Sequence, residues 1–200
     1  RDDNYWEPRE WSGNALMKAL RQIQKKYNIC MGKLLFYGYS AGSQCANLFP
    51  AWKPENTRAW VSHACGVFHE PTSRMRDVPG LVTCGDADTA RYIISRNFVE
   101  KCREKGINII WKSFPNHPHD VPPGSLKLAR AFLAHHHQLH LRDLGGSPVR
   151  NINGGILFIG DDQEGKFYPA NSPKARNVLR EDRVLFSSQE IASAWGTPEK

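Results

Sequence analysis

The stretch Phe36-Tyr37-Gly38-Tyr39-Ser40-Ala41-Gly42 decides the fold of this chain, because it places a serine between two glycines directly after an apolar run. Residues 33–37 are typical of a buried parallel strand, and residues 43–49 are predicted to be helical. Ser40 is therefore expected at the turn between a strand and a helix. Such a turn strains the backbone and brings the chain close to its neighbours, so we expect Gly38 and Gly42 to be needed for their missing side chains.

Strands and helices alternate along the rest of the main region. Further strands are predicted at residues 57–65, 80–84 and 107–114, and further helices at residues 13–27, 89–105 and 125–140. Short connections between alternating elements favour an α/β fold, with a mostly parallel sheet flanked by helices. The helix at residues 13–27 carries Leu16, Leu20 and Ile23 on one face and is expected to cover the sheet, with Ser12 as its N-cap.

The composition changes at Gly145, which predicts a main region at residues 1–144, a linker at 145–155 and an appendage at 156–200. Two apolar runs and a serine-to-glutamate capping box (Ser187–Glu190) predict a small β-β-α unit there. The unit faintly resembles small zinc modules with a Phe-His/Tyr…Cys-Pro pattern. Because Tyr168 and Ser172-Pro173 stand where metal ligands would be expected, we expect no metal.

The composition also narrows the functional classes. The net charge is +7, but the basic residues alternate with acids and form no stripe with interleaved aromatics, so nucleic-acid binding is not expected. No apolar run approaches the roughly 20 residues of a membrane helix, so no membrane association is expected. The five cysteines occur singly, which predicts buried free thiols and slightly favours a reducing compartment such as the cytoplasm. Because the chain begins with Arg1 rather than Met, a leader could have been removed and the location stays open.

The Gly38-x-Ser40-x-Gly42 turn resembles the nucleophile elbow of the α/β-hydrolase superfamily, most of all its serine esterase, polyhydroxyalkanoate depolymerase and feruloyl esterase branch. The resemblance covers about residues 5–141. It implies that a nucleophilic serine, an acid and a histidine follow in that order, each after the C-terminal end of a strand. Ser40 matches the nucleophile, and the backbone N–H of Ala41 matches one oxyanion donor.

Two positions of the implied triad have alternatives. The family pattern Gly-x-x-Asp matches Gly85-Asp86-Ala87-Asp88 and points to Asp88 as the acid, with Asp86 as the alternative. His119, just before the final helix, matches the base better than His117, which precedes a proline.

A second oxyanion donor is implied in a loop after an earlier strand, but only the helix at residues 13–27 precedes the strand of the elbow. The usual first strands are therefore expected to be missing from the residues given. We expect either that the chain is a fragment or that a second chain completes the sheet, since an open sheet edge invites pairing.

The resemblance implies a serine hydrolase that cleaves a carboxylic ester, in a small-molecule or polymeric substrate, through an acyl-enzyme and without a cofactor. A serine peptidase of the prolyl-oligopeptidase type would use the same triad. A non-catalytic binding or scaffold protein with this fold is the third hypothesis, because one oxyanion donor is missing.

Overall fold

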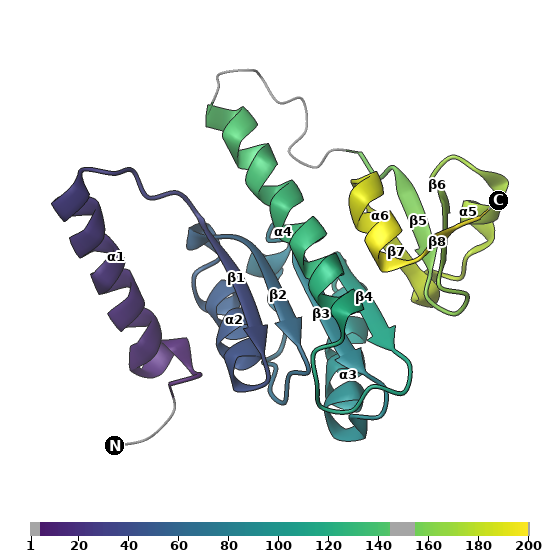
Figure 1. The fold of residues 1–200 in the computed structure, drawn as a ribbon, viewed down its shortest axis with the longest axis horizontal. Coiled ribbons are helices and arrows are strands. Elements are labelled where there is room, and N and C mark those ends of the chain that lie inside the picture. Colours follow the sequence, from purple (N-terminus) through teal and green to yellow (C-terminus); the bar gives the residue numbers. More distant parts are fainter. Residues whose placement is uncertain (1–4, 145–154, 200) are drawn as a thin grey trace.

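The computed structural model describes residues 5–144 and 155–199, so most of the predicted linker lies outside the described residues. The main region is built on a parallel sheet of four strands in the order β1-β2-β3-β4 (Figure 1). The strands are β1 (Leu34–Tyr39), β2 (Thr57–His63), β3 (Gly80–Gly85) and β4 (Ile109–Phe114). The predicted α/β fold class is confirmed.

Helices cover both faces of this sheet. Side chains of a strand alternate between the two faces, and in this sheet both sets of side chains are mainly apolar. Trp60, Val82 and Trp111 point toward α2 (Ala41–Trp52) and α3 (Thr89–Glu104), where they join one hydrophobic cluster. Their neighbours Val61, Leu81 and Ile110 point toward α4 (Pro123–Leu144) and join a second cluster. β2 and β3 are buried almost throughout, as expected for central strands of a parallel sheet.

Single-turn helices interrupt the connections at Pro54–Asn56, Ser73–Met75 and Arg180–Asp182. Pro50, which by its sequence pattern should interrupt α2, lies inside it, and the helix continues to Trp52. Pro50 is buried, so packing keeps the helix intact although proline removes one backbone donor.

The C-terminal module (residues 156–199) contains more elements than the predicted β-β-α unit. Its mixed sheet has the order β7-β5-β6-β8, and the β-β-α prediction missed two strands and a helix. The elements are β5 (Phe158–Asp161), β6 (Lys166–Pro169), α5 (Pro173–Asn177), β7 (Arg183–Phe186), α6 (Gln189–Trp195) and β8 (Thr197–Pro198). β6 has only two consecutive buried side chains, too short an apolar signal to distinguish from a loop.

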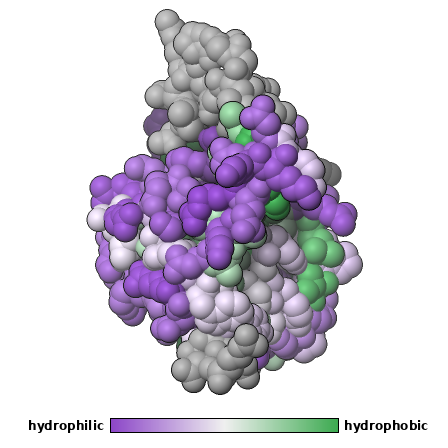
Figure 2. Space-filling view, turned by 90° about the vertical axis from the view of Figure 1, so that its left-hand side faces the viewer, coloured by the Kyte–Doolittle hydropathy of each residue, from purple (hydrophilic) through white to green (hydrophobic). Residues whose placement is uncertain are grey.

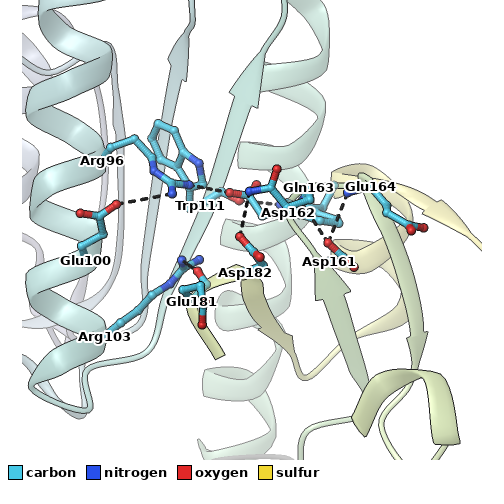
Figure 3. Close-up of polar contacts among 11 residues, drawn as sticks. Arg96, Glu100, Arg103, Trp111, Asp161, Asp162, Gln163, Glu164, Glu181 and Asp182 are labelled. Atoms are coloured by element: carbon cyan, nitrogen blue, oxygen red, sulfur yellow. Dashed lines mark hydrogen bonds and ion pairs between the residues drawn. The ribbon is translucent and has the colours of Figure 1, made fainter. Parts of the chain in front are cut away.

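The module packs beside β4 and shares the α4-side cluster, to which it adds Phe186, Ile191 and Trp195. The indole N–H of Trp195 donates to the carbonyl oxygen of Trp111 at 2.5 Å. Ionic contacts complete this interface, which we call the module interface: Arg96 of α3 bonds Asp162 at 2.7 Å, and Glu100 lies on the other side of Arg96 at 3.4 Å (Figure 3). Burial raises the pKa of Asp162, and the positive charges of Arg96, Arg103 and Lys112 partly oppose this rise.

The helix α1 (Gly13–Tyr27) does not cover the sheet, contrary to the prediction. It contacts mainly the π-helical turn Pro8–Ser12 before it, and it lies beyond the β1 edge of the sheet (Figure 1). Ser12 is itself helical, and the Glu7 carboxylate caps this segment by accepting from the backbone N–H of Arg9. Seen from this side, the surface is mostly hydrophilic, with a hydrophobic patch along one flank (Figure 2).

The cysteines lie partly as predicted. Cys65, Cys84 and Cys102 are buried, but Cys30 is exposed and Cys45 is half-buried. All five are free thiols, and burial raises the pKa of Cys84 and Cys102 to about 12. Across the part of the chain that the structure describes, no helix has the length and apolar character needed to cross a bilayer.

Candidate active site

Ser40 lies between the end of β1 and the start of α2, with φ 54° and ψ −122°. Residues other than glycine rarely adopt this backbone conformation, so the turn is strained. The Ser40 N–H donates to the His63 carbonyl at 3.0 Å, and this bond stabilises the turn. The turn needs Gly38, since a Cβ there would lie 2.2 Å from the Gly42 carbonyl oxygen. The prediction that Gly42 also needs to lack a side chain is wrong: a Cβ there would meet nothing within 4 Å, because only the Gly42 backbone faces Gly38.

The structure brings Ser40, His119 and Asp88 into one chain of hydrogen bonds. His119 Nε2 lies 2.9 Å from Ser40 Oγ, and His119 Nδ1 lies 2.6 Å from Asp88 Oδ2. The Asp88 side chain is 6% exposed, whereas the His119 side chain is 32% exposed. The three residues follow β1, β3 and β4, and the C-terminal ends of these parallel strands lie at the same end of the sheet.

Asp88 is held from both sides, because its second carboxylate oxygen contacts the Arg91 guanidinium at 3.1 Å. Asp86 does not reach His119 and instead accepts the backbone N–H of Asn116 at 2.7 Å. His117 turns toward Asp120, with 3.2 Å between Nδ1 and Oδ2. The geometry therefore favours Asp88 and His119 over the two alternatives.

Gly85 contributes to this geometry in a way that sequence analysis missed. A Cβ at Gly85 would lie 2.1 Å from the His117 carbonyl oxygen, so the loop that carries His119 can approach β3 only because residue 85 lacks a side chain. The His117 carbonyl also accepts the Ala87 N–H at 3.1 Å. The glycine in Gly-x-x-Asp was the available sequence signal, although the pattern alone does not say which backbone it approaches.

Ala41 is the first residue of α2, where backbone N–H groups have no acceptor within the helix and the helix dipole favours negative charge. Its N–H is thus suitable for an oxyanion next to Ser40 Oγ. Within residues 5–144 and 155–199, β1 is the first strand of the sheet, so no earlier strand supplies the loop that would carry a second donor.

A buried polar cluster under the turn fixes the start of α2, and sequence analysis did not identify it. The Asn47 amide donates to the carbonyl oxygens of Ser43 and Val67, at 2.9 and 3.0 Å, and so ties α2 to the segment after β2. Ser62 Oγ donates to the Ser43 carbonyl at 3.3 Å. These contacts fix the backbone of the first turn of α2, which directly follows Ser40.

Among the described residues, no group of three or more His, Cys, Asp or Glu side chains is arranged to hold a metal ion. In the C-terminal module, the Tyr168 hydroxyl donates to Glu164 at 3.2 Å, and Ser172 Oγ accepts the Ala175 N–H as the cap of α5. Both residues at the presumed ligand positions therefore have other contacts.

Comparison with known proteins finds no matching family model and no curated relative. Several solved structures are similar. One is a thermostable esterase (19% identity, TM-score 0.47, covering 65% of this chain and 35% of the esterase). Another is a CE1 ferulic acid esterase of the anaerobic fungus Anaeromyces mucronatus (15%, 0.46, 54% and 46%). A third is an uncharacterized protein of Bacillus cereus (24%, 0.44, 51% and 37%).

The chain thus spans between about a third and a half of the length of these three proteins. Similarity at this level carries no conclusion about activity.

Proposed function

We propose that this chain carries the catalytic residues of a serine hydrolase of the α/β-hydrolase type that cleaves carboxylic esters. One observation carries the proposal: a strained serine at a strand-to-helix turn is joined to a histidine at 2.9 Å, and that histidine to a buried carboxylate at 2.6 Å. This arrangement meets the geometric requirement for an activated nucleophile, namely a base within hydrogen-bond reach and a third group that orients the base.

In the proposed reaction, Ser40 Oγ attacks the ester carbonyl while His119 Nε2 accepts its proton. Asp88 accepts from Nδ1–H, which keeps Nε2 free to act as the base, and Arg91 balances the charge of the Asp88 carboxylate. The Ala41 N–H donates to the oxyanion of the tetrahedral intermediate. His119 then protonates the departing alcohol, and a water molecule activated by His119 hydrolyses the acyl-enzyme to release the acid and restore Ser40.

No cofactor enters these steps. The rival activity, a peptidase of the prolyl-oligopeptidase type, would use the same residues on an amide, so substrate choice separates the two.

The test is covalent labelling by a fluorophosphonate probe, followed by intact-protein and peptide mass spectrometry. We expect one adduct on Ser40, no adduct in Ser40→Ala, and an unchanged adduct in Ser73→Ala, a substitution of an exposed serine. Hydrolysis of p-nitrophenyl acetate should also disappear in Ser40→Ala, while a prolyl p-nitroanilide should not be turned over. A wild-type mass unchanged after prolonged exposure to the probe would refute the proposal and favour a non-catalytic role.

A further inference from the structure

Two side chains outside the proposed triad bond the loop that carries His119. The Tyr39 hydroxyl donates to the carbonyl oxygen of His119 at 2.8 Å. His63 Nε2 lies 2.7 Å from the carbonyl oxygen of Asp120, the next residue. Successive backbone carbonyls of this loop are thus each bonded by a side chain that comes from the end of a neighbouring strand, β1 or β2.

His63 is fully buried, and its ring connects three elements. While Nε2 contacts the loop, Nδ1 lies 2.6 Å from Thr83 Oγ1 of β3 and 3.0 Å from Ser125 Oγ at the start of α4. A carbonyl oxygen can only accept, so Nε2 carries the proton that bonds Asp120, and Nδ1 of the neutral ring accepts from a hydroxyl. Burial lowers the pKa of His63, which favours this neutral form.

The Tyr39 ring also contacts the rings of both His63 and His119. The Tyr39 ring stacks on the His119 imidazole, with 5.0 Å between centroids and 28° between planes. The Tyr39 and His63 rings lie 5.8 Å apart between centroids. The backbone carbonyl of His63 accepts the Ser40 N–H, so the same residue bonds the nucleophile turn and the base loop.

We propose that Tyr39 and His63 are positioning residues, which fix the His119–Asp120 backbone so that Nε2 of His119 stays within reach of Ser40 Oγ. The inference rests on the proposed function. It goes beyond that function because the polar groups of both residues bond backbone carbonyls of the loop and take no part in the proton transfer. Positional errors of about 1 Å cost catalysts on the order of 100-fold in rate, so loss of either bond should lower kcat and leave KM largely unchanged.

Tyr39→Phe removes the hydroxyl and keeps the ring. We expect kcat for p-nitrophenyl acetate to fall by about 10-fold with KM within about twofold of wild type. Tyr37→Phe is the matched control, because Tyr37 lies on the same strand with its side chain 41% exposed and should retain full activity. Equal kcat values for Tyr39→Phe and Tyr37→Phe would overturn the role of Tyr39.

His63 is tested by a pair of amides of different length. The Gln Nε2 can occupy the place of His Nε2 and donate to Asp120, whereas Asn ends near the place of Nδ1 and cannot reach that carbonyl. We expect His63→Asn to lose about 10- to 100-fold in kcat and His63→Gln to recover most of it. Equal kcat losses in the two variants, or none in either, would overturn the role of His63. If His63→Asn does not fold, His63→Gln decides alone: a kcat close to that of wild type supports the role, and a kcat below that of Tyr39→Phe overturns it.

A readout without substrate separates failure of this inference from failure of the proposed function. The Nδ1 proton of His119, shared with Asp88 at 2.6 Å, should give a low-field proton NMR signal that disappears in His119→Gln. We expect this signal to broaden in Tyr39→Phe and His63→Asn but not in Tyr37→Phe. A wild-type protein with this signal and no esterase activity would refute the proposed function alone, whereas unchanged signals in both variants would refute the positioning role.

Discussion

The two edges of the parallel sheet are finished in different ways. At the β4 edge, the C-terminal module contributes Phe186 and Trp195 to the core and adds the Arg96–Asp162 ion pair. At the β1 edge, Leu35 and Tyr37 are 36% and 41% exposed, and α1 lies apart from the sheet (Figure 1). Ser40 follows β1 at the open edge, whereas His119 follows β4 at the covered edge and Asp88 follows β3 next to it. The module therefore packs on the side of the base, and among the described residues no similar module packs on the side of Ser40.

The C-terminal module and the main region share one hydrophobic core. One continuous cluster includes Val61 of β2, Phe132 of α4 and Trp195 of α6. The predicted domain boundaries at residues 144 and 156 stay predictions, yet stability should depend on contacts that cross them.

The largest effect is expected from Trp195→Ala. This side chain is 2% exposed and bonds the Trp111 carbonyl, so its removal leaves a cavity and an unpaired acceptor. We expect the free energy of unfolding to fall by about 3–5 kcal/mol in urea titrations. Trp11→Ala, at a tryptophan 52% exposed on the α1 side, should cost less than about 1 kcal/mol. Similar losses in the two variants would abolish the contrast between the edges.

The next effect is expected from Arg96→Met, which leaves Asp162 buried without its closest partner. Because the Arg96 side chain is 23% exposed, we expect a loss of about 2–3 kcal/mol, below that of a fully buried pair. Adding Asp162→Asn should restore most of it. The surface pair Arg74–Glu55, with both side chains more than half exposed, is the control, and Arg74→Met should cost at most about 0.5 kcal/mol. A double variant as unstable as Arg96→Met alone would contradict this explanation.

A smaller effect is expected from pH through His136 of α4. Burial, with additional effects of His135 and Arg58, lowers the pKa of His136 to about 3. The unfolded chain binds a proton near pH 6.5 and the folded chain does not, so this contribution is complete above about pH 6.5 and is lost as pH falls toward 3. Between pH 7 and 5 we expect a loss of roughly 1–2 kcal/mol. His136→Gln should reduce this loss, His137→Gln at an exposed position should not, and equal slopes in all three proteins would contradict the prediction.

The smallest effect is expected at the open edge. Tyr37→Lys should change the free energy of unfolding by less than about 0.5 kcal/mol, because the side chain is largely solvated. It should also reduce concentration-dependent self-association in sedimentation experiments, since a charge on an edge strand opposes strand pairing. A loss above 1 kcal/mol would mean that this edge is covered after all. That a second chain or an upstream segment completes the sheet stays a prediction.

The sequence predicted the elements that have a strong local signal. The apolar runs and their spacing were enough for the four parallel strands, and the Gly38-x-Ser40-x-Gly42 pattern was enough for the strained turn at Ser40. The order of Ser40, Asp88 and His119 identified three residues that the structure brings within hydrogen-bond distance, and their catalytic roles stay predictions.

Other features depend on contacts between distant residues. A periodic helix such as α1 has an apolar face, but periodicity does not say whether a sheet lies against it. The short strand β6 and the helix α5 have little local signal and are fixed by pairing and packing within the module. Likewise, Tyr39 and His63 are ordinary residues in the sequence. They bond His119 and Asp120 only because the C-terminal ends of parallel strands meet at one end of the sheet. The local sequence determines that each segment forms a strand. Only the tertiary structure decides which side chains at the strand ends come into contact.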